Sequence, residues 1–443
     1  MTPTPPTVDL LVAPRWLLPI EPQGLVLEQH ALIVDAGRIR DLLPLAEARQ
    51  RYLPRQIIDL PQHAVLPGLV NLHTHAAMSL LRGIADDLPL MQWLQEHIWP
   101  AEGKHANPAF CEDGARLAFA EMIRSGTTCV NDMYFFPDAT ARVAGELGLR
   151  ATVGLITTDF ATAWAADADD CIHKGLELHD ALKDKPLLRT IFAPHAPYTV
   201  SDAPLRKIRR YADELGIGIH MHVHETAHEV GSALQATGKR PWQRLKELEL
   251  LGPDFIAVHM TQLSDEEIAE AAQLGVHIAH CPESNLKLAS GFCPLARLQA
   301  AGVNIGIGTD GAASNNDLDL FGEMRTAALV AKAVAGDPQA VSAAQALHMA
   351  TLGGARALGL DAEIGSLSVG KSADFIAVDL SRIATQPLYH LQSQLVYAAG
   401  RDQVSDVFVA GRALLRGGQF TTLDETRVLA KAGEWREKIK PYA

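Results

Sequence analysis

Two histidines separated by a single residue, His73 and His75, follow a short apolar run of this chain. Alternate side chains of an extended strand point to the same face, so both imidazoles would project together from the end of such a strand. Two imidazoles that converge in this way can bind one divalent metal ion. The alternative is a pair of polar residues that cap a buried strand, and an isolated His-x-His does not separate the two interpretations.

Other apolar runs of the chain also end in side chains that can bind a metal or transfer a proton. These side chains are His195, His220, His222, His224, Glu225, His259, His280 and Asp310. Any one of them could be a satisfied core or capping residue. Because buried unpaired polar groups are costly, a set of this size indicates a metal site rather than packing.

The run His220-Met221-His222-Val223-His224 leaves one choice open. By the period of a strand all three histidines share one face. A ligand must lie near the end of the strand, which permits His222 or His224. His220 lies deeper in the strand and is predicted to belong to the core.

The apolar runs that carry these residues predict the strands of a parallel sheet. Amphipathic helical patterns, for example 204–214 and 265–273, lie between them. Eight strands that alternate with helices predict a (β/α)₈ barrel, a fold that places its catalytic groups at the C-terminal ends of the strands. An open doubly wound sheet is the alternative, but no Gly-x-Gly-x-x-Gly follows the first strand. The predicted strands span 69–73, 128–132, 151–155, 189–195, 217–222, 255–259, 276–280 and 303–310.

Short strand patterns of a different kind lie at both ends of the chain. They occupy residues 8–12, 31–35, 371–379 and 404–411. We therefore predict a small β-sandwich domain formed from both termini, residues 1–66 and 366–443, around a catalytic barrel of residues 67–365.

Composition narrows the class of protein. The chain of 443 residues carries a net charge of −13 without a basic stripe, which argues against nucleic acid as a partner. It has no apolar run long enough to span a bilayer, and its first residues lack the features of a signal peptide. Its five cysteines form no Cys-x-x-Cys pair. Reduced thiols in a cytoplasmic protein that binds no membrane are the expectation.

Taken together, the motifs resemble the amidohydrolase superfamily, in the branch of metal-dependent purine and triazine deaminases and hydrolases. The motifs are Pro-Gly-Leu-Val-Asn-Leu-His-Thr-His at 67–75, His-Val-His-Glu-Thr at 222–226, His-Cys-Pro-Glu-Ser-Asn at 280–285, Gly-Thr-Asp-Gly-Ala at 308–312 and Gly-Lys-Ser-Ala-Asp-Phe at 370–375. The last of these resembles the small β domain of the family, and the family pattern His-x-x-Glu-Thr selects His222 over His224.

The resemblance implies that one divalent metal is bound, with His73, His75, His222 and Asp310 as its ligands. Three imidazoles and a carboxylate suit Zn²⁺ with an open position for water, and iron accepts the same ligand types. His195 stands where bimetallic members of the superfamily carry a carboxylated lysine, which favours a single ion.

The implied reaction is a hydrolytic deamination. A bound Zn²⁺ lowers the pKa of its water and so supplies hydroxide for attack on an electron-poor ring carbon. Asp310 and His259 are the expected acceptors of the water's proton. Glu225 is expected to protonate the ring nitrogen and then the departing amine. The His-x-Glu and Pro-Cys-x-x-Cys signature of another class of zinc deaminases is absent from the chain.

The segment 80–102 resembles that of family members acting on S-adenosylhomocysteine and 5′-methylthioadenosine. In those enzymes a carboxylate that corresponds to Glu102 accepts the ribose hydroxyls, and a histidine that corresponds to His195 contacts the nucleoside. A carboxylate only accepts hydrogen bonds, so it suits a vicinal diol. Without the family context, Glu102 would be interpreted as a solvated charge at a helix end. Trp93 and Trp99 are candidates for an apolar recess around a 5′-thioether, with core packing as the alternative.

One departure from the family concerns the amino-acid tail of adenosylhomocysteine. Members that accept this tail carry a cation after the third strand, but residues 157–167 of this chain contain no basic residue, and Arg150 precedes the strand. The sequence therefore favours methylthioadenosine or adenosine as the substrate.

Two other functions stay open at this point. One is a guanine, pterin or s-triazine aminohydrolase or chlorohydrolase, whose substrates lack a ribose. The other is a metal- or ligand-binding barrel without catalytic activity. The resemblance also implies a homodimer or a higher homo-oligomer.

Overall fold

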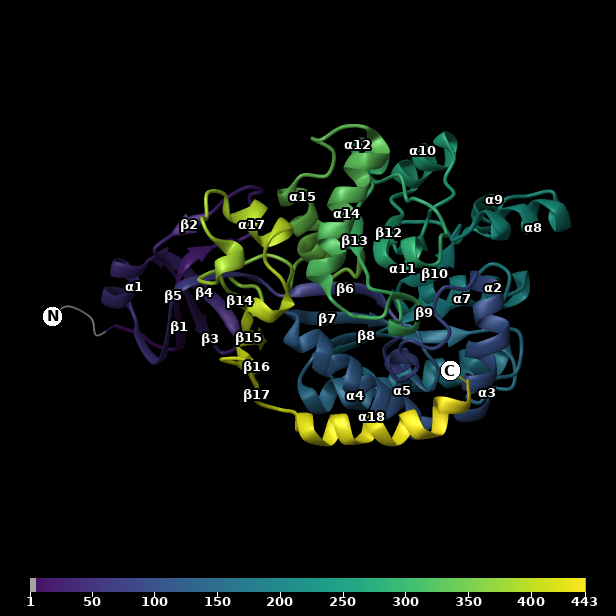
Figure 1. The fold of residues 1–443 in the computed structure, drawn as a ribbon, viewed down its shortest axis with the longest axis horizontal. Coiled ribbons are helices and arrows are strands. Elements are labelled where there is room, and N and C mark those ends of the chain that lie inside the picture. Colours follow the sequence, from purple (N-terminus) through teal and green to yellow (C-terminus); the bar gives the residue numbers. More distant parts are fainter. Residues whose placement is uncertain (1–4, 443) are drawn as a thin grey trace.

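Two β-sheets organise the computed structural model, which describes residues 5–442 (Figure 1). One is an eight-stranded parallel sheet with the order β13-β12-β11-β10-β9-β8-β7-β6. A hydrogen bond of 3.0 Å from the Asp310 amide to the His73 carbonyl brings its two edges together. The predicted (β/α)₈ barrel is thereby confirmed. Its strands are β6 (Leu69–Thr74), β7 (Thr127–Asp132), β8 (Arg150–Thr157), β9 (Leu188–Pro194), β10 (Ile219–Val223), β11 (Phe255–His259), β12 (His277–His280) and β13 (Ile305–Ile307).

The barrel strands are buried on both faces because helices cover the outside of the sheet. Every residue of β7, β8, β10 and β11 is buried, and β8 and β11 are largely apolar runs, whereas β10 alternates apolar residues with histidines. Where the sheet closes, Gly308 lies against the backbone of His73, and a Cβ atom there would approach the His73 amide nitrogen to 2.8 Å. A glycine is therefore required at the point where the last ligand-bearing loop meets the first strand.

The second sheet contains both ends of the chain. β5 lies at its centre, parallel to β1 and antiparallel to β14, so N-terminal and C-terminal strands share one hydrogen-bonded sheet. This confirms the predicted small β-rich unit built from both termini. Only Gly68 separates β5 from β6, so the chain passes directly from this sheet into the barrel. The strands are β1 (Thr7–Leu17), β2 (Leu27–Glu28), β3 (His30–Asp35), β4 (Arg38–Pro44), β5 (Leu53–Pro67), β14 (Phe375–Asp379), β15 (Val404–Val409), β16 (Arg412–Arg416) and β17 (Gln419–Phe420).

A buried ion pair joins the small sheet to the base of the barrel. Arg150, the first residue of β8, donates to both carboxylate oxygens of Asp374 at 2.9 and 3.2 Å. Asp374 also accepts hydrogen bonds from the Ser372 hydroxyl and the Ala410 amide. The two residues are only 6% and 3% exposed, so each charge depends on the other for its compensation.

Most of the helices lie around the barrel (Figure 1). The predicted helices at 204–214 and 265–273 correspond to α7 and α10. In Figure 1 the C-terminal helix α18 runs along the lower edge of the molecule, next to α4. The helices are α1 (Leu45–Arg51), α2 (Leu90–Trp93), α3 (Trp99–His105), α4 (Pro108–Arg124), α5 (Pro137–Leu147), α6 (Ala168–Leu182), α7 (Asp202–Leu215), α8 (Ala227–Thr237), α9 (Pro241–Glu247), α10 (Asp265–Leu274), α11 (Pro282–Lys287), α12 (Leu295–Ala300), α13 (Ala312–Asn315), α14 (Leu320–Ala335), α15 (Ala343–His348), α16 (Gly354–Ala357), α17 (Leu391–Tyr397) and α18 (Glu425–Ile439).

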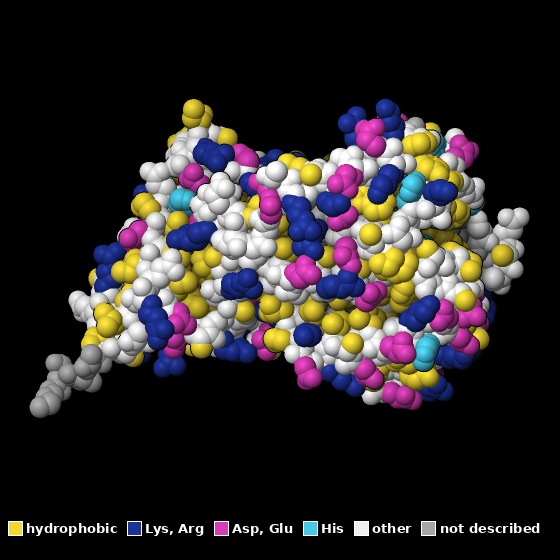
Figure 2. All heavy atoms as spheres, turned by 90° about the horizontal axis from the view of Figure 1, so that it is seen from below, with side chains coloured by type: hydrophobic (Ala, Val, Ile, Leu, Met, Phe, Trp, Pro, Cys, Tyr) yellow, Lys and Arg dark blue, Asp and Glu magenta, His cyan; other side chains and the backbone are white. Residues whose placement is uncertain are grey.

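One face of the molecule shows mixed charge (Figure 2). On the face of the molecule in Figure 2, Lys and Arg side chains are intermingled with Asp and Glu side chains. Within residues 5–442, no helix combines the length and the apolar character that a membrane span requires.

Candidate active site

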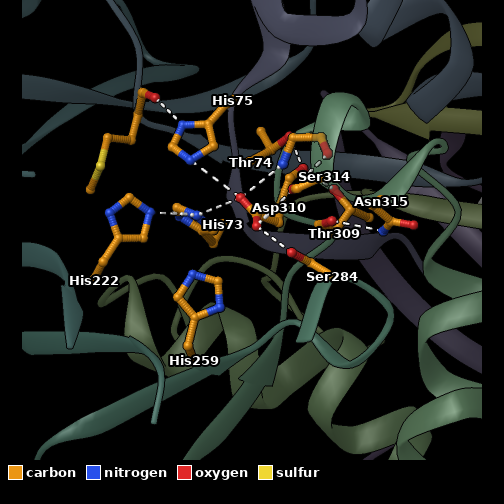
Figure 3. Close-up of polar contacts among 12 residues, drawn as sticks. His73, Thr74, His75, His222, His259, Ser284, Thr309, Asp310, Ser314 and Asn315 are labelled. Atoms are coloured by element: carbon orange, nitrogen blue, oxygen red, sulfur yellow. Dashed lines mark hydrogen bonds and ion pairs between the residues drawn. The ribbon is translucent and has the colours of Figure 1, made fainter. Parts of the chain in front are cut away.

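Four side chains converge at the C-terminal end of the barrel strands (Figure 3). One nitrogen of each of His73, His75 and His222 and one oxygen of Asp310 lie within 4.8 Å of one another. The Nε2 atoms of His73 and His75 lie 3.3 and 3.2 Å from Asp310 Oδ1, and the Nε2 atoms of His73 and His222 lie 3.1 Å apart. The structure thus brings together the four residues that the sequence predicts as metal ligands.

The far sides of two imidazoles determine what the cluster can bind. The Nδ1 atom of His222 donates to the His195 carbonyl at 2.8 Å, and Nδ1 of His75 donates to the Met133 carbonyl. A carbonyl oxygen only accepts, so both Nδ1 atoms carry protons, and in their neutral form the two imidazoles turn the lone pairs of Nε2 toward the cluster. Lone pairs of two imidazoles and a carboxylate oxygen that face one point fit a divalent cation such as Zn²⁺.

Asp310 does not lie on a strand, contrary to the prediction of a strand over 303–310. β13 ends at Ile307, and Asp310 has a left-handed backbone with a φ of 58°. Its Oδ2 atom accepts hydrogen bonds from the hydroxyls of Ser284 (2.6 Å) and Ser314 (2.9 Å), which leaves Oδ1 facing the imidazoles. Burial opposes the charge, but in the metal-free site hydrogen bonds from the imidazoles of His73 and His75 outweigh it and lower the pKa of Asp310 well below its usual value.

The histidines on either side of His222, His220 within β10 and His224 directly after it, lie outside the cluster. His220 is fully buried beneath it, with Nε2 at 3.0 Å from His73 Nδ1, so it supports a ligand from the barrel core. His224 is fully buried and its Nε2 atom accepts a hydrogen bond from the Trp242 amide at 3.2 Å. The position of His222 within the cluster agrees with the choice that the family pattern makes.

Two acid–base groups face the cluster from the next elements. His259 donates from Nδ1 to the Asn285 side-chain oxygen at 2.9 Å, which leaves its Nε2 atom free to accept a proton. This nitrogen lies 3.9 Å from a carboxylate oxygen of Glu225. Burial raises the pKa of Glu225 above its ordinary value and so favours the protonated acid.

A cavity of about 620 Å³ extends from the cluster toward α3. Glu102 lies on its wall and accepts a hydrogen bond of 2.6 Å from the Tyr134 hydroxyl, which leaves the second carboxylate oxygen free. Burial raises the pKa of Glu102 to about 7. His195 also lines the cavity, with Nδ1 at 3.1 Å from the Thr199 hydroxyl, and burial lowers the pKa of His195 to about 4.

Trp93 and Trp99, which belong to the segment 80–102, both line this cavity but differ in their exposure to solvent. Trp93 is 5% exposed and donates to the Ile84 carbonyl at 3.2 Å, so it belongs to the core as well. Trp99 is 40% exposed at the rim, together with Phe160 and Tyr198. None of the described residues that line the cavity is a lysine or an arginine.

Comparison with known proteins agrees with this geometry. Residues 64–414 match the model of the amidohydrolase family. The chain belongs to the amidohydrolase family. Its barrel, its closing loop and all five motifs lie within the matched range.

Relatives within this family carry names that concern adenosine-type nucleosides. A 5-methylthioadenosine/S-adenosylhomocysteine deaminase of Teredinibacter turnerae is 49% identical over 98% of each chain. A 5′-deoxyadenosine deaminase of Methanothermobacter thermautotrophicus is 44% identical over 85% of this chain and 87% of its own. The crystal structure of an adenosine deaminase from Xanthomonas campestris with bound zinc is 53% identical, covers 99% of this chain and 100% of its own, and has a TM-score of 0.98.

Some side chains of the site were not predicted from the sequence. Tyr134 follows β7 and holds Glu102, but a tyrosine after a strand carries no sequence signal of such a role. Ser284 lies within the quoted 280–285 motif, so the motif drew attention to the segment without naming the hydroxyl. Ser314 lies on α13, directly after the closing loop, and only the fold shows that it reaches Asp310.

Proposed function

We propose that this protein is a zinc-dependent hydrolase that converts an adenosine-type nucleoside and water to the inosine-type product and ammonia. The observation that carries the proposal is one cavity with Glu102 on its wall and Glu225 at its inner end, where three of the four clustered metal-binding groups, His75, His222 and Asp310, also line it. A purine would occupy the inner end, and the free oxygen of Glu102 would accept hydroxyls of the ribose. The names of the relatives support the same class of substrate.

The proposed chemistry distributes protons among three side chains. When bound by His73, His75, His222 and Asp310, a divalent ion supplies hydroxide near neutral pH. His259 Nε2 or Asp310 accepts the proton that the water loses. Glu225 gives its proton to the ring nitrogen next to the attacked carbon, which makes the ring a better acceptor. Glu225 then takes the proton of the hydroxyl group on that carbon as the carbonyl forms and delivers it to the departing amine, and the proton held by His259 or Asp310 restores the acid form of Glu225.

The ribose end would involve Glu102 and His195. Tyr134 occupies one carboxylate oxygen of Glu102, so the other is directed at the diol. His195 has its Nδ1 atom engaged by Thr199, which leaves Nε2 as the nitrogen that can contact the nucleoside. Burial keeps this imidazole neutral, as a hydrogen-bonding rather than an ion-pairing group requires.

The outer part of the cavity would receive the 5′ substituent of the nucleoside. Phe160 and Tyr198 are each half exposed there, and Trp99 lies at the rim. A carboxylate that enters an apolar recess without a cation loses its hydration without compensation. We therefore propose methylthioadenosine, 5′-deoxyadenosine or adenosine as substrates in preference to adenosylhomocysteine.

Three further proposals concern the whole molecule. We propose that the barrel domain comprises residues 67–365, with 1–66 and 366–443 forming the small domain, because β5 and β14 pair while Gly68 leads into β6. Five cysteines, all unpaired and buried, support the cytoplasm as its location. The family resemblance supports a homodimer or a higher homo-oligomer, which light scattering coupled to gel filtration measures.

An ammonia-release assay on the zinc-loaded protein tests the function. The panel holds methylthioadenosine, 5′-deoxyadenosine, adenosine, adenosylhomocysteine, guanine, cytosine and melamine. We expect release from the first three and its loss in Glu225→Gln. Release from guanine or melamine alone would point to the aminohydrolases that act on rings without a ribose, and no release from any compound would overturn the proposal.

A further inference from the structure

The side chain of Glu225 is not held in place by its own hydrogen bonds. No described residue donates a hydrogen bond to its carboxyl group, and the nearest charged partner is His259 at 3.9 Å. The side chain is nevertheless buried and must point at one ring atom of the substrate. Its direction therefore depends on how its backbone is fixed.

The backbone before Glu225 forms a concave turn that holds a carboxylate of the same chain. His224 has a left-handed conformation with a φ of 53°, which is uncommon for a residue other than glycine. The amides of His224 and Glu225 consequently point the same way and donate to the two oxygens of Glu229, at 3.1 and 2.8 Å. Successive amides around a left-handed residue make a site for an anion, and the Glu229 carboxylate fills it.

In the sequence, Thr226-Ala227-His228-Glu229 has the pattern of an ordinary capping box at the start of α8. Half of that box is present, because the Thr226 hydroxyl accepts a hydrogen bond of 3.1 Å from the Glu229 amide. In the complete boxes of α10 and α15, the side chain of the fourth residue returns to the capping amide. The Glu229 carboxylate instead accepts from the amides one and two residues before the capping residue, those of Glu225 and His224.

Thr261 holds the same turn from its other side. Its hydroxyl donates to the Glu225 carbonyl at 2.7 Å, and its amide donates to the His224 carbonyl at 3.0 Å. The residue is 8% exposed and follows β11 by two positions, so it belongs to the same strand end as His259. Both amides and both carbonyls of residues 224 and 225 thus have partners outside their own turn.

We propose that Glu229 and Thr261 are positioning residues that direct the Glu225 carboxyl at the reacting ring. The inference rests on the proposed role of Glu225 in proton transfer. Neither residue transfers a proton itself. Each acts through the backbone of residues 224 and 225. The left-handed conformation of His224 would relax if the Glu229 carboxylate no longer accepted from the two amides, or if Thr261 no longer donated to the carbonyls.

Two pairs of variants test the proposal on the zinc-loaded full chain. Thr261→Val removes the hydroxyl at nearly constant volume, and Thr261→Ser keeps it. Glu229→Gln leaves one acceptor where two are needed, and Gln345→Ala opens the complete capping box of α15 far from the site as its control. The measurements are kcat and KM for methylthioadenosine, bound zinc and the melting temperature.

We expect Thr261→Val and Glu229→Gln to lower kcat about 10- to 100-fold, the loss that a displacement near 1 Å causes. Their KM and zinc content should stay at the wild-type level, because the ribose contacts and the metal ligands are untouched. Thr261→Ser and Gln345→Ala should keep the wild-type kcat. If Glu229→Gln does not fold, the threonine pair decides alone.

Two outcomes would overturn the inference by itself. One is a folded Thr261→Val with the kcat of the wild type. Another is a loss of kcat that merely follows lost zinc or a lower melting temperature, since that is a structural effect. If Glu225→Gln is inactive while the positioning variants are fully active, only the positioning role fails. A wild-type protein without turnover overturns the proposed function and this inference with it.

Discussion

The carboxylate of Glu102 offers the sharpest test of the nucleoside as substrate. Its one oxygen accepts from Tyr134 at 2.6 Å, and its other oxygen faces the cavity without a partner among the described residues. Glu102→Gln keeps an acceptor for Tyr134 and replaces the free oxygen by an amide that cannot accept. A hydrogen bond to a charged group contributes about 1.5–3 kcal/mol, so losing one should lower kcat/KM about 10- to 150-fold for adenosine.

The same change measured on 2′,3′-dideoxyadenosine separates the contact from other effects. This compound has no hydroxyls at positions 2′ and 3′, so the variant has no ribose contact there to lose. We expect kcat/KM of the wild type and of Glu102→Gln to differ less than about threefold on this compound, as in a double-mutant cycle in which one partner is already absent. Glu96→Gln, which alters an exposed carboxylate in the same segment 80–102, serves as the control.

The pH dependence provides a second, independent signature. Burial raises the pKa of Glu102 to about 7, so the carboxylate that accepts the diol forms as the pH rises through 7. The KM of the wild type for adenosine should therefore fall over this interval, and Glu102→Gln should lack that change. Equal losses on adenosine and its dideoxy analogue would refute the contact. Full activity of the variant on adenosine would remove the structural support for a nucleoside.

Three further predictions concern stability and metal binding. Asp374→Asn leaves Arg150 buried without its counter-charge and should cost about 3–5 kcal/mol in urea unfolding, whereas Arg49→Ala at an exposed pair should cost under about 1 kcal/mol; equal costs would contradict the buried pair. Burial disfavours a charge on His75, but its contacts with Asp310 outweigh this and raise the pKa of His75 to about 9 in the metal-free site. Zinc binding at pH 7.5 should therefore release about one proton, seen in calorimetry as a heat that depends on the buffer, and a heat independent of the buffer would contradict it. Burial lowers the pKa of His280 to about 3, so the unfolded chain takes up a proton below pH 6.5 that the folded chain refuses, and unfolding free energy should fall by up to about 1.4 kcal/mol per pH unit on acidification. His280→Asn should lessen that slope, and an unchanged slope would argue against the shift.

Periodicity and motif order predicted the barrel and most of the strand-borne site. His73 lies at the end of β6 and His222 within β10, where the alternation of side chains in a strand applies directly. Asp310 was placed on a strand and lies instead three residues beyond β13 in a left-handed turn. Loop conformation depends on contacts such as those with Ser284 and Ser314, which no local pattern encodes.

Glu229 also shows that a local sequence pattern does not determine the partners of a side chain. Its local pattern predicts a helix cap, and the cap is half formed. Its carboxylate goes elsewhere because the left-handed turn at His224 presents two amides to it. Choosing between those two destinations requires the position of Thr261, 32 residues later, which pulls the carbonyls of the turn to the other side.

By itself, the sequence determined the fold class and the types of side chain at the strand ends, because these follow from the period of a strand and the order of motifs. It also determined that the segment after β8 has no cation. Only the tertiary structure decided which lone pairs face the metal site, which oxygen of Glu102 is free and what holds Glu225 in place. Those properties come from hydrogen bonds between residues far apart in the chain, and such partners are fixed only when the strands close into a barrel.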